Sequence, residues 1–230
     1  MYDPPQTGPM VKREVCRLLG CNDLDVERDW ARLPVLKTVN ALFSFLYSTE
    51  PQVKWCAVRA MGKAAARLAD EDLEAARNVV RRLMWSLNDE SGGIGWGAGE
   101  AMGEILARHD GLAREYTHIL LSYARRDGNL LDNDGLLQGV LWGLTRVAES
   151  RHELLPDAAR HITMHLQSPD ASIRALAVEL LGLLGDATVR NCLEELAADQ
   201  SEVTLFLRDC EQRVRIADLV ARALASMGCP

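Results

Sequence analysis

Apolar and polar positions along the chain alternate with the 3.6-residue period of an α-helix, and one such helical pattern recurs about every 40 residues. The segment VKWCAVRAMG, residues 53–62, matches IGWGAGEAMG, residues 94–103, at five of ten positions. The same frame continues along the chain, with its first apolar slot at Leu136, Ile173 and Val214. In each copy the small and apolar positions share one helical face. The pattern therefore predicts five equivalent helices with one buried face each.

A second amphipathic segment precedes each of these helices, so the repeating unit is predicted to be a helix pair. The preceding segments cover residues 33–47, 71–87, 112–125, 152–166 and 187–197. Turn and cap residues between the two halves predict second helices that start near Pro51, Gly92, Asp132, Pro169 and Glu211. We expect an all-α fold, a right-handed α-solenoid of about five helix pairs.

The ends of the chain depart from this pattern. Residues 1–27 are predicted to form an N-terminal extension and one capping helix over residues 11–19, and residues 28–228 the five repeats of a single domain spanning residues 1–230. Residues 199–210 interrupt the repeat. Within them, residues 203–207 (VTLFL) have the character of a short extended segment, which predicts either a hairpin or a loop.

Composition agrees with a helical protein, because aromatic residues make up only 5% of the chain while 48% of its residues are hydrophobic. The net charge of −7 disfavours nucleic acid as a partner. No apolar run has the length of a signal-peptide core or a membrane span. The six cysteines, at positions 16, 21, 56, 192, 210 and 229, form no C-x-x-C pair. We expect a cytoplasmic protein with reduced thiols, no membrane partner and no metal.

The second helices resemble those of HEAT-like repeats, particularly the short bacterial kind found in phycobilin lyases. The best match is PDASIRALAVELLG, residues 169–182, and the resemblance covers residues 30–228. The whole chain is also similar to a small family of uncharacterised bacterial HEAT-like proteins. The resemblance implies an armadillo-like solenoid that serves as a scaffold or binding module, because only a minority of such arrays are enzymes.

Two motifs raise the question of a cofactor or metal. The segment GIGWGA, residues 93–98, satisfies G-x-G-x-x-G/A, but that fingerprint binds a dinucleotide only between a β-strand and a helix. The residues before it are helical by period. His161 and His165 lie four apart on one predicted helix, yet a single His152-Glu153 pair cannot supply the ligands of a di-iron site. We expect no cofactor and no metal site.

Glu100 and Glu104 also share one helical face, as carboxylates do in acid and base catalysis. A solvated charged face is the far commoner explanation of this spacing. We expect no catalytic residue.

A stripe beside the buried face of the second helices is predicted to be the concave surface of the stack. Successive copies place Trp55, Trp96 and Gln138 in one row, and Arg59, Glu100 and Trp142 in the next. Large aromatic residues beside charges are typical of interaction hot spots. The alternative is that these tryptophans only fill gaps between adjacent repeats.

Six glycines within residues 92–103 lie in the same region, although each interior glycine costs a helix about 1 kcal/mol relative to alanine. Gly95 and Gly99 fall where other copies carry larger residues, so close packing alone does not explain them. We expect them to leave Trp96 and the amino end of its helix open to a partner. The alternative is a kinked or partly unwound repeat without a ligand.

The function expected from these features is a non-catalytic interaction or scaffold module. Its partner, a protein or a peptide, is predicted to bind the stripe formed by Trp55, Arg59, Gly95, Trp96, Gly99, Glu100, Gln138 and Trp142. The alternative is an enzyme of the lyase or hydroxylase kind that uses the same groove. The identity of the partner and the oligomeric state stay open.

Overall fold

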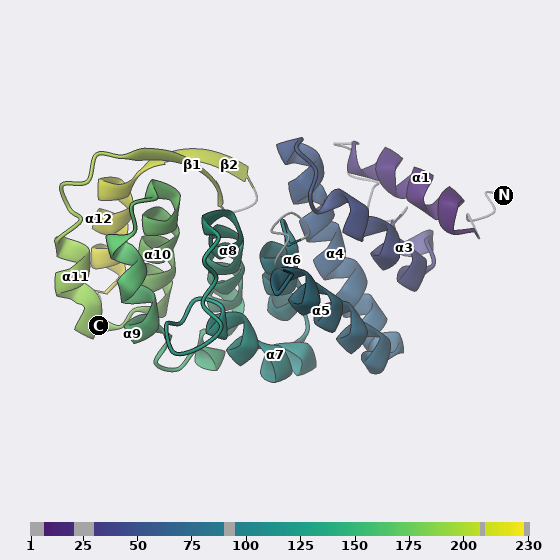
Figure 1. The fold of residues 1–230 in the computed structure, drawn as a ribbon, viewed down its shortest axis with the longest axis horizontal. Helices are drawn as coiled ribbons and strands as arrows, with labels where there is room; N and C mark the ends of the chain where they lie inside the picture. The colour runs from purple at the N-terminus through teal and green to yellow at the C-terminus, as the bar shows by residue number, and fades with distance from the viewer. Residues whose placement is uncertain (1–6, 21–29, 90–94, 208–209, 228–230) are drawn as a thin grey trace.

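The computed structural model describes residues 7–20, 30–89, 95–207 and 210–227, and Figure 1 shows their helices stacked in an elongated array with the two chain ends on opposite sides. The first helices of the pairs are α3 (Val35–Leu42), α5 (Leu73–Leu87), α7 (Asp110–Ser122), α9 (Ala158–Ile162) and α11 (Arg190–Glu194). The second helices are α4 (Pro51–Glu71), α6 (Ala98–Arg108), α8 (Asp134–Arg151), α10 (Ala171–Leu184) and α12 (Ile216–Ser226). The chain has the all-α repeat fold that the sequence predicts.

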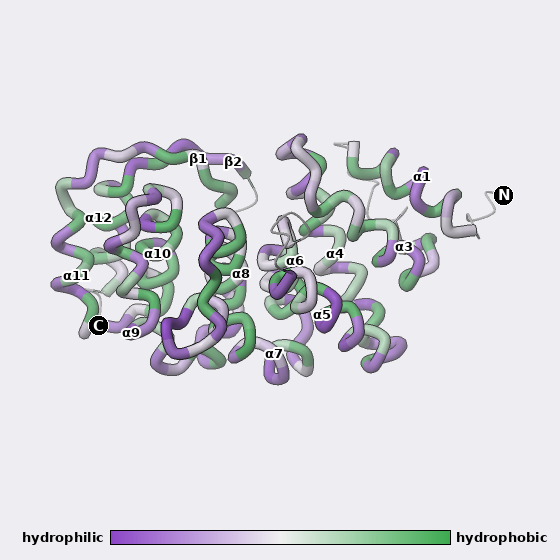
Figure 2. Tube along the Cα trace, viewed as in Figure 1, coloured by the Kyte–Doolittle hydropathy of each residue, from purple (hydrophilic) through white to green (hydrophobic). Residues whose placement is uncertain are grey.

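The second helices form one continuous row, because each of them contacts the second helix of the next pair. Their apolar faces are buried, as Val58, Met61, Met102 and Ile105 illustrate on α4 and α6. Figure 2 shows that the helices carry hydrophobic and hydrophilic turns side by side, as expected of amphipathic helices in a stack. Among the described helices, none combines the length and apolarity that crossing a membrane requires.

Helix α1 (Gly8–Leu19) covers the N-terminal end of the row, where it packs on α3 and α4. It buries the apolar side chains Val11, Val15, Leu18 and Leu19. Residues 11–19, predicted to be helical, all belong to it.

Capping residues determine where several second helices begin. Helix α4 begins at Pro51 as predicted, where proline's missing N–H costs nothing. Helix α8 begins at Asp134 after Asn133 accepts a hydrogen bond from the backbone N–H of Leu136, and α10 follows Asp170, which accepts from two backbone N–H groups. Both starts lie within two residues of the predicted positions.

Helix α6 begins later than predicted. Gly92 lies outside the described residues, and residues 95–97 form a turn that places Ala98 at the helix start. Gly97 has a φ of 77°, a left-handed conformation that glycine adopts without strain. The residues before this segment form α5, so the strand that a dinucleotide fingerprint requires is replaced by a helix.

The first helices of the last two pairs are short and interrupted. The segment predicted over residues 152–166 contains the 3-10 helices η2 (His152–Leu154) and η3 (Thr163–Gln167) on either side of α9. Pro156 stands between η2 and α9, where it prevents a continuous α-helix. Two further 3-10 helices, η1 (Phe43–Phe45) and η4 (Ala187–Val189), adjoin α3 and α11.

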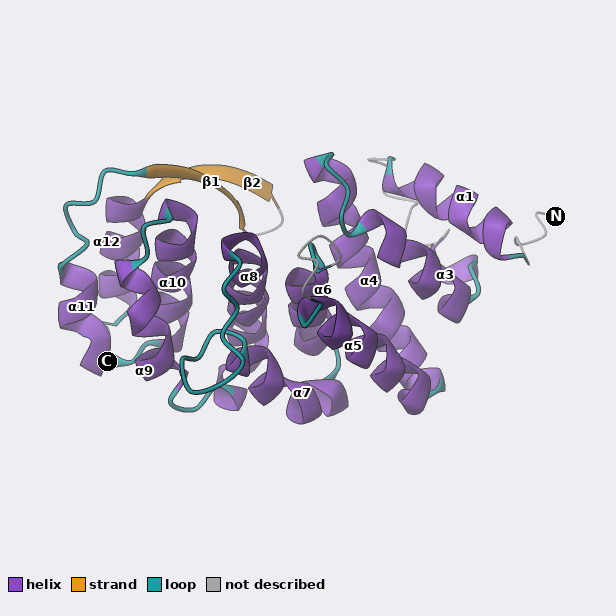
Figure 3. Cartoon of the chain, viewed as in Figure 1, coloured by secondary structure: helices purple, strands orange, loops and turns teal. Residues whose placement is uncertain are grey.

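The last repeat contains a β-hairpin of β1 (Glu202–Leu207) and β2 (Cys210–Arg215), drawn in orange in Figure 3. The extended segment predicted over residues 203–207 is therefore one strand of a hairpin. The helix predicted to start near Glu211 starts instead at Ile216, and Val214, expected in its first slot, pairs with Val203 across the hairpin. Apolar spacing misplaced this helix because β2 supplies an apolar residue at the same position.

Candidate partner-binding surfaces

Three aromatic rings converge where the middle of the predicted stripe meets the hairpin. The Trp55 ring of α4 stacks on the Phe206 ring of β1 at 4.3 Å between centroids, with 10° between the planes. Trp142 of α8 lies 4.8 Å from Trp55, and its indole Nε1 donates a hydrogen bond to the backbone oxygen of Phe206. We call Trp55, Trp142 and Phe206 the tryptophan cluster. Two of the predicted hot-spot residues are thus covered by the chain's own hairpin.

The acidic residues of the stripe are also engaged within the molecule. Glu100 is only 5% exposed, and its carboxylate lies 2.7 Å from the Lys54 ammonium. Lys54 in turn lies 5.0 Å from the centre of the Trp55 ring. The expected alternative of a solvated face is wrong here, because burial and ion pairing account for Glu100.

Glu104 is fully buried and forms ion pairs with two arginines, Arg108 on its own helix at 2.5 Å and Arg146 of α8 at 2.8 Å. A buried carboxylate needs such partners, since an unpaired charge away from water is costly. The two carboxylates therefore join α4, α6 and α8 through separate cations.

The glycines of α6 are packing residues. A Cβ on Gly99 would lie 2.7 Å from the backbone of Gly139 and Val140, and one on Gly103 would clash with the backbone of Gly143. Glycines spaced four apart on both α6 and α8 thus bring the two helix backbones into contact. A Cβ on Gly95 would lie 2.8 Å from the Ser86 oxygen. The expectation that close packing does not explain Gly95 and Gly99 is wrong.

Two other stripe residues have partners outside the tryptophan cluster. Gln138 donates a hydrogen bond of 3.2 Å to Asp170, which also caps α10. Arg59 lines a hollow of about 480 Å³ between α1 and α4, beside the half-buried Cys56. Burial raises the pKa of the Cys56 thiol, so this cysteine has little thiolate character.

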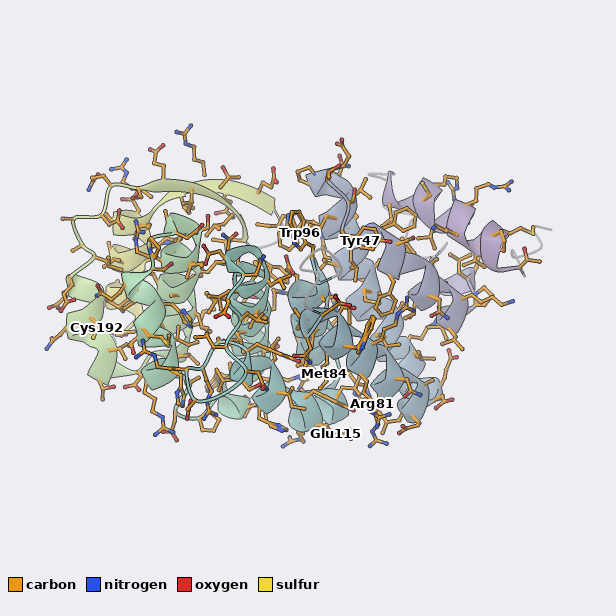
Figure 4. All side chains as sticks on the ribbon, viewed as in Figure 1. Tyr47, Arg81, Met84, Trp96, Glu115 and Cys192 are labelled. Carbon is orange, nitrogen blue, oxygen red and sulfur yellow. The ribbon has the colours of Figure 1, made fainter. Side chains whose placement is uncertain are left out.

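Trp96 faces a different surface, which the sequence did not predict. It is 53% exposed and lines a hollow of about 410 Å³ together with Trp85 of α5, 63% exposed, and Tyr47, 51% exposed. Figure 4 shows Tyr47 and Trp96 near each other between the ends of α3 and α6. We call the hollow and these three rings, together with Phe43 and Arg82, the aromatic groove.

Within the aromatic groove, a cation–π contact and a hydrogen bond hold the Arg82 side chain in place. The Arg82 guanidinium carbon lies 3.7 Å from the centre of the Phe43 ring, and the same guanidinium donates to Asn40 at 3.3 Å. The signal in the sequence that could have revealed this surface is Trp85, which occupies the polar face of α5 near Arg81 and Arg82.

The two histidines spaced four apart have separate environments. His165 is buried, its Nε2 lies 2.8 Å from the backbone oxygen of Ala124, and burial lowers its pKa. His161 lies 3.8 Å from the Asp127 carboxylate, and burial followed by the neighbouring Arg125 lowers its pKa. Within the described part of the chain, no group of three or more His, Cys, Asp or Glu side chains is placed to hold a metal ion.

Comparisons with known proteins agree with the architecture. No family model matches the chain. An uncharacterized protein of Archaeoglobus fulgidus is 25% identical over 181 residues, which cover 78% of this chain and 91% of that protein.

Solved structures of similar fold include designed repeat proteins and a mutant of a natural protein. A designed armadillo repeat protein in complex with peptide (KR)4 has a TM-score of 0.55 at 12% identity, covering 95% of this chain and 99% of its own. A mutant of Kap121p has a TM-score of 0.57 at 13% identity, covering 96% of this chain and 25% of its own. These likenesses show the fold alone: the chain is an all-α helical-repeat solenoid.

Proposed function

We propose that this protein is a non-catalytic α-solenoid that binds a segment of a partner protein, or a peptide, in the aromatic groove. The observation that carries the proposal is the exposure of Tyr47, Trp85 and Trp96 around one hollow. The chain has only five tryptophans, four tyrosines and three phenylalanines, so three half-exposed rings at one place are a large share. Exposed tryptophan and tyrosine grouped around a pocket are the usual anchors of protein interfaces.

The stripe of second helices is the weaker candidate for the partner site. Trp55 and Trp142 already contact Phe206, and Glu100 and Glu104 are already paired with cations. A partner that used these groups would first have to displace the hairpin and break the ion pairs. The designed armadillo neighbour holds a basic (KR)4 peptide, but in this chain the two central carboxylates are not free to bind one.

Selection of peptides from an unbiased display library tests the proposal. The full chain is the bait, and each enriched peptide is then titrated against the wild type, Trp85→Ala, Trp96→Ala and the control Leu183→Ala. Leu183 is an exposed apolar residue on α10, far along the chain from the groove. We expect enriched peptides to lose about tenfold or more in affinity with each tryptophan variant and nothing with the control.

Peptides that bind all four proteins equally would contradict the groove as the site. If the peptides bind these four proteins equally but bind Phe206→Ala more weakly, the site would instead lie on the stripe. The lyase- or hydroxylase-type alternative predicts a bound chromophore or stoichiometric iron in protein purified from native cells. Finding either would contradict a non-catalytic role.

A further inference from the structure

The polar groups around the aromatic groove include more free hydrogen-bond donors than free acceptors. Ser44 donates to the Ala41 oxygen at 2.8 Å, Ser86 donates to the Arg82 oxygen at 3.1 Å, and the Asn40 side-chain oxygen accepts from Arg82. The Trp85 and Trp96 indoles make no hydrogen bond to any other described residue. Each indole N–H can only donate. What the groove offers a ligand is therefore mainly aromatic surface and hydrogen-bond donors.

An extended proline-rich segment has the complementary chemistry. In the polyproline II conformation the backbone forms no internal hydrogen bonds, so its carbonyl oxygens are free to accept. Proline has no N–H and so needs no acceptor from the groove, while its ring packs on exposed aromatic faces. A helical ligand fits less well, because its carbonyls are already bonded within the helix and cannot use the two indole donors.

Charge adds a second requirement. Among the described residues that line the groove, Arg82 alone is charged, and its position over the Phe43 ring leaves guanidinium N–H groups available beyond the bond to Asn40. A guanidinium pairs best with a carboxylate, which accepts two parallel hydrogen bonds. None of the lining residues that the structure describes carries a carboxylate.

We infer that the aromatic groove binds an extended proline-rich segment that carries an acidic side chain, with the prolines on Tyr47, Trp85 and Trp96 and the carboxylate on Arg82. This inference rests on the proposed function, since it names the ligand class of the same groove.

Four synthetic peptides with blocked termini test the inference on the full chain. The first repeats the unit Pro-Pro-Glu-Pro-Pro, the second and third replace Glu by Gln and by Lys, and the fourth replaces every proline by alanine. Binding is followed by tryptophan fluorescence and by calorimetry. We expect the Glu peptide to bind about tenfold more tightly than the Gln peptide, the Lys peptide to bind more weakly still, and the alanine peptide to show no measurable binding.

Matched arginine variants separate the role of charge from a general loss of structure. Arg82→Gln should abolish the preference for Glu over Gln, whereas Arg81→Gln, at the neighbouring exposed position outside the groove, should keep it. Trp85→Ala and Trp96→Ala should weaken every proline-containing peptide by about tenfold or more. Circular dichroism spectra that match the wild type show that the variants are folded.

Any one of four results would overturn the inference. Binding of the alanine peptide as tight as that of the Glu peptide would exclude recognition of proline. A Glu preference that survives in Arg82→Gln would exclude Arg82 as the anion site. If library peptides without proline bind the groove while the proline peptides do not, this inference fails and the proposed function stands. If no peptide responds to Trp85→Ala or Trp96→Ala, both fail.

Discussion

Trp96 and Trp142 show how differently two residues of one predicted stripe are used. Trp142 is 5% exposed and bonded to the hairpin, whereas Trp96 is 53% exposed beside Tyr47 and Trp85. Their neighbours in sequence do not distinguish them. The difference arises because α6 begins at Ala98, so Trp96 lies in the preceding turn, while Trp142 lies within α8.

We therefore expect the two alanine substitutions to lower the stability of the protein by very different amounts. Trp142→Ala should lower the free energy of unfolding by about 3 to 5 kcal/mol, because it empties a buried site. Trp96→Ala should lower it by less than about 1 kcal/mol, because little buried surface is lost. Urea denaturation of both variants measures this, and equal losses would show that Trp96 is a core residue.

His165 links stability to pH. Burial lowers the pKa of His165 in the folded protein below its ordinary value of 6.5, which applies to the unfolded chain. At a pH between the folded-state pKa and the unfolded-state pKa, the unfolded chain therefore binds a proton at this side chain and the folded protein does not. The contribution of neutral His165 to stability is complete above about pH 6.5 and is lost as the pH falls below it.

The expected result is a fall in the unfolding free energy as the pH drops below about 6.5, which His165→Gln should make shallower. Glutamine keeps a side-chain N–H that can donate to the Ala124 oxygen. His152→Gln, at an exposed position, is the control and should leave the slope unchanged. An identical slope in all three proteins would rule out His165 as the titrating group.

At the scale of elements, glycines on both α6 and α8 bring these two helices into close contact. Gly99 and Gly103 face Gly139 and Gly143, and the side chain of Glu100 lies over Gly139. Removing side chains from both helices lets the backbones touch. The buried ion pair of Glu104 with Arg146 then joins the same two helices.

Gly99→Ala and Gly103→Ala should each destabilise the protein by about 1 to 3 kcal/mol, because the added methyl group overlaps the facing backbone. Gly8→Ala is the control, since a Cβ there meets nothing within 4 Å and should be neutral or stabilise by up to about 1 kcal/mol. Thermal melts distinguish the cases. Higher stability in Gly99→Ala would restore the view that this glycine is there to expose Trp96.

For the whole molecule, the tryptophan cluster is an exception to solenoid architecture. Repeats in such stacks contact mainly their neighbours, so stability is close to a sum of nearest-neighbour contributions. Here Trp55 of the first pair touches Trp142 of the third and Phe206 of the hairpin in the last. The hairpin therefore ties the C-terminal repeat to the N-terminal one.

Removing the contact between the hairpin and Trp55 should change hydrogen exchange in α4, far along the chain from the substituted residue. In Phe206→Ala, we expect the backbone amides of α4 to exchange hydrogen about two- to tenfold faster, because the stack between Trp55 and Phe206 is gone. Val203→Ala, in the same strand, keeps Phe206 and should leave α4 unchanged. Unchanged exchange in α4 with Phe206→Ala would mean that the contact adds no stability to the first repeat.

The sequence by itself determined the helical repeat, because the spacing of apolar residues and the capping residues that specify an amphipathic helix are close together in the chain. Pro51, Asn133 and Asp170 are examples of such residues at helix starts. It also predicted that one extended segment would break the last repeat. These features depend on residues within a few turns of one another.

Tertiary structure decided everything that depends on residues far apart in the chain. Val214 fits an apolar slot in a helix or in a strand, and only its pairing with Val203 selects the strand. Glu100 looks like a surface residue until Lys54, 46 positions away, is placed beside it. Gly99 has room for a side chain in an isolated helix, but the backbone of Gly139 occupies that room in the folded protein. Tyr47, Trp85 and Trp96 form one surface only because the fold brings three separate segments together. Burial is a property of the packed molecule, so local spacing predicts which residues can share a face but not what covers that face.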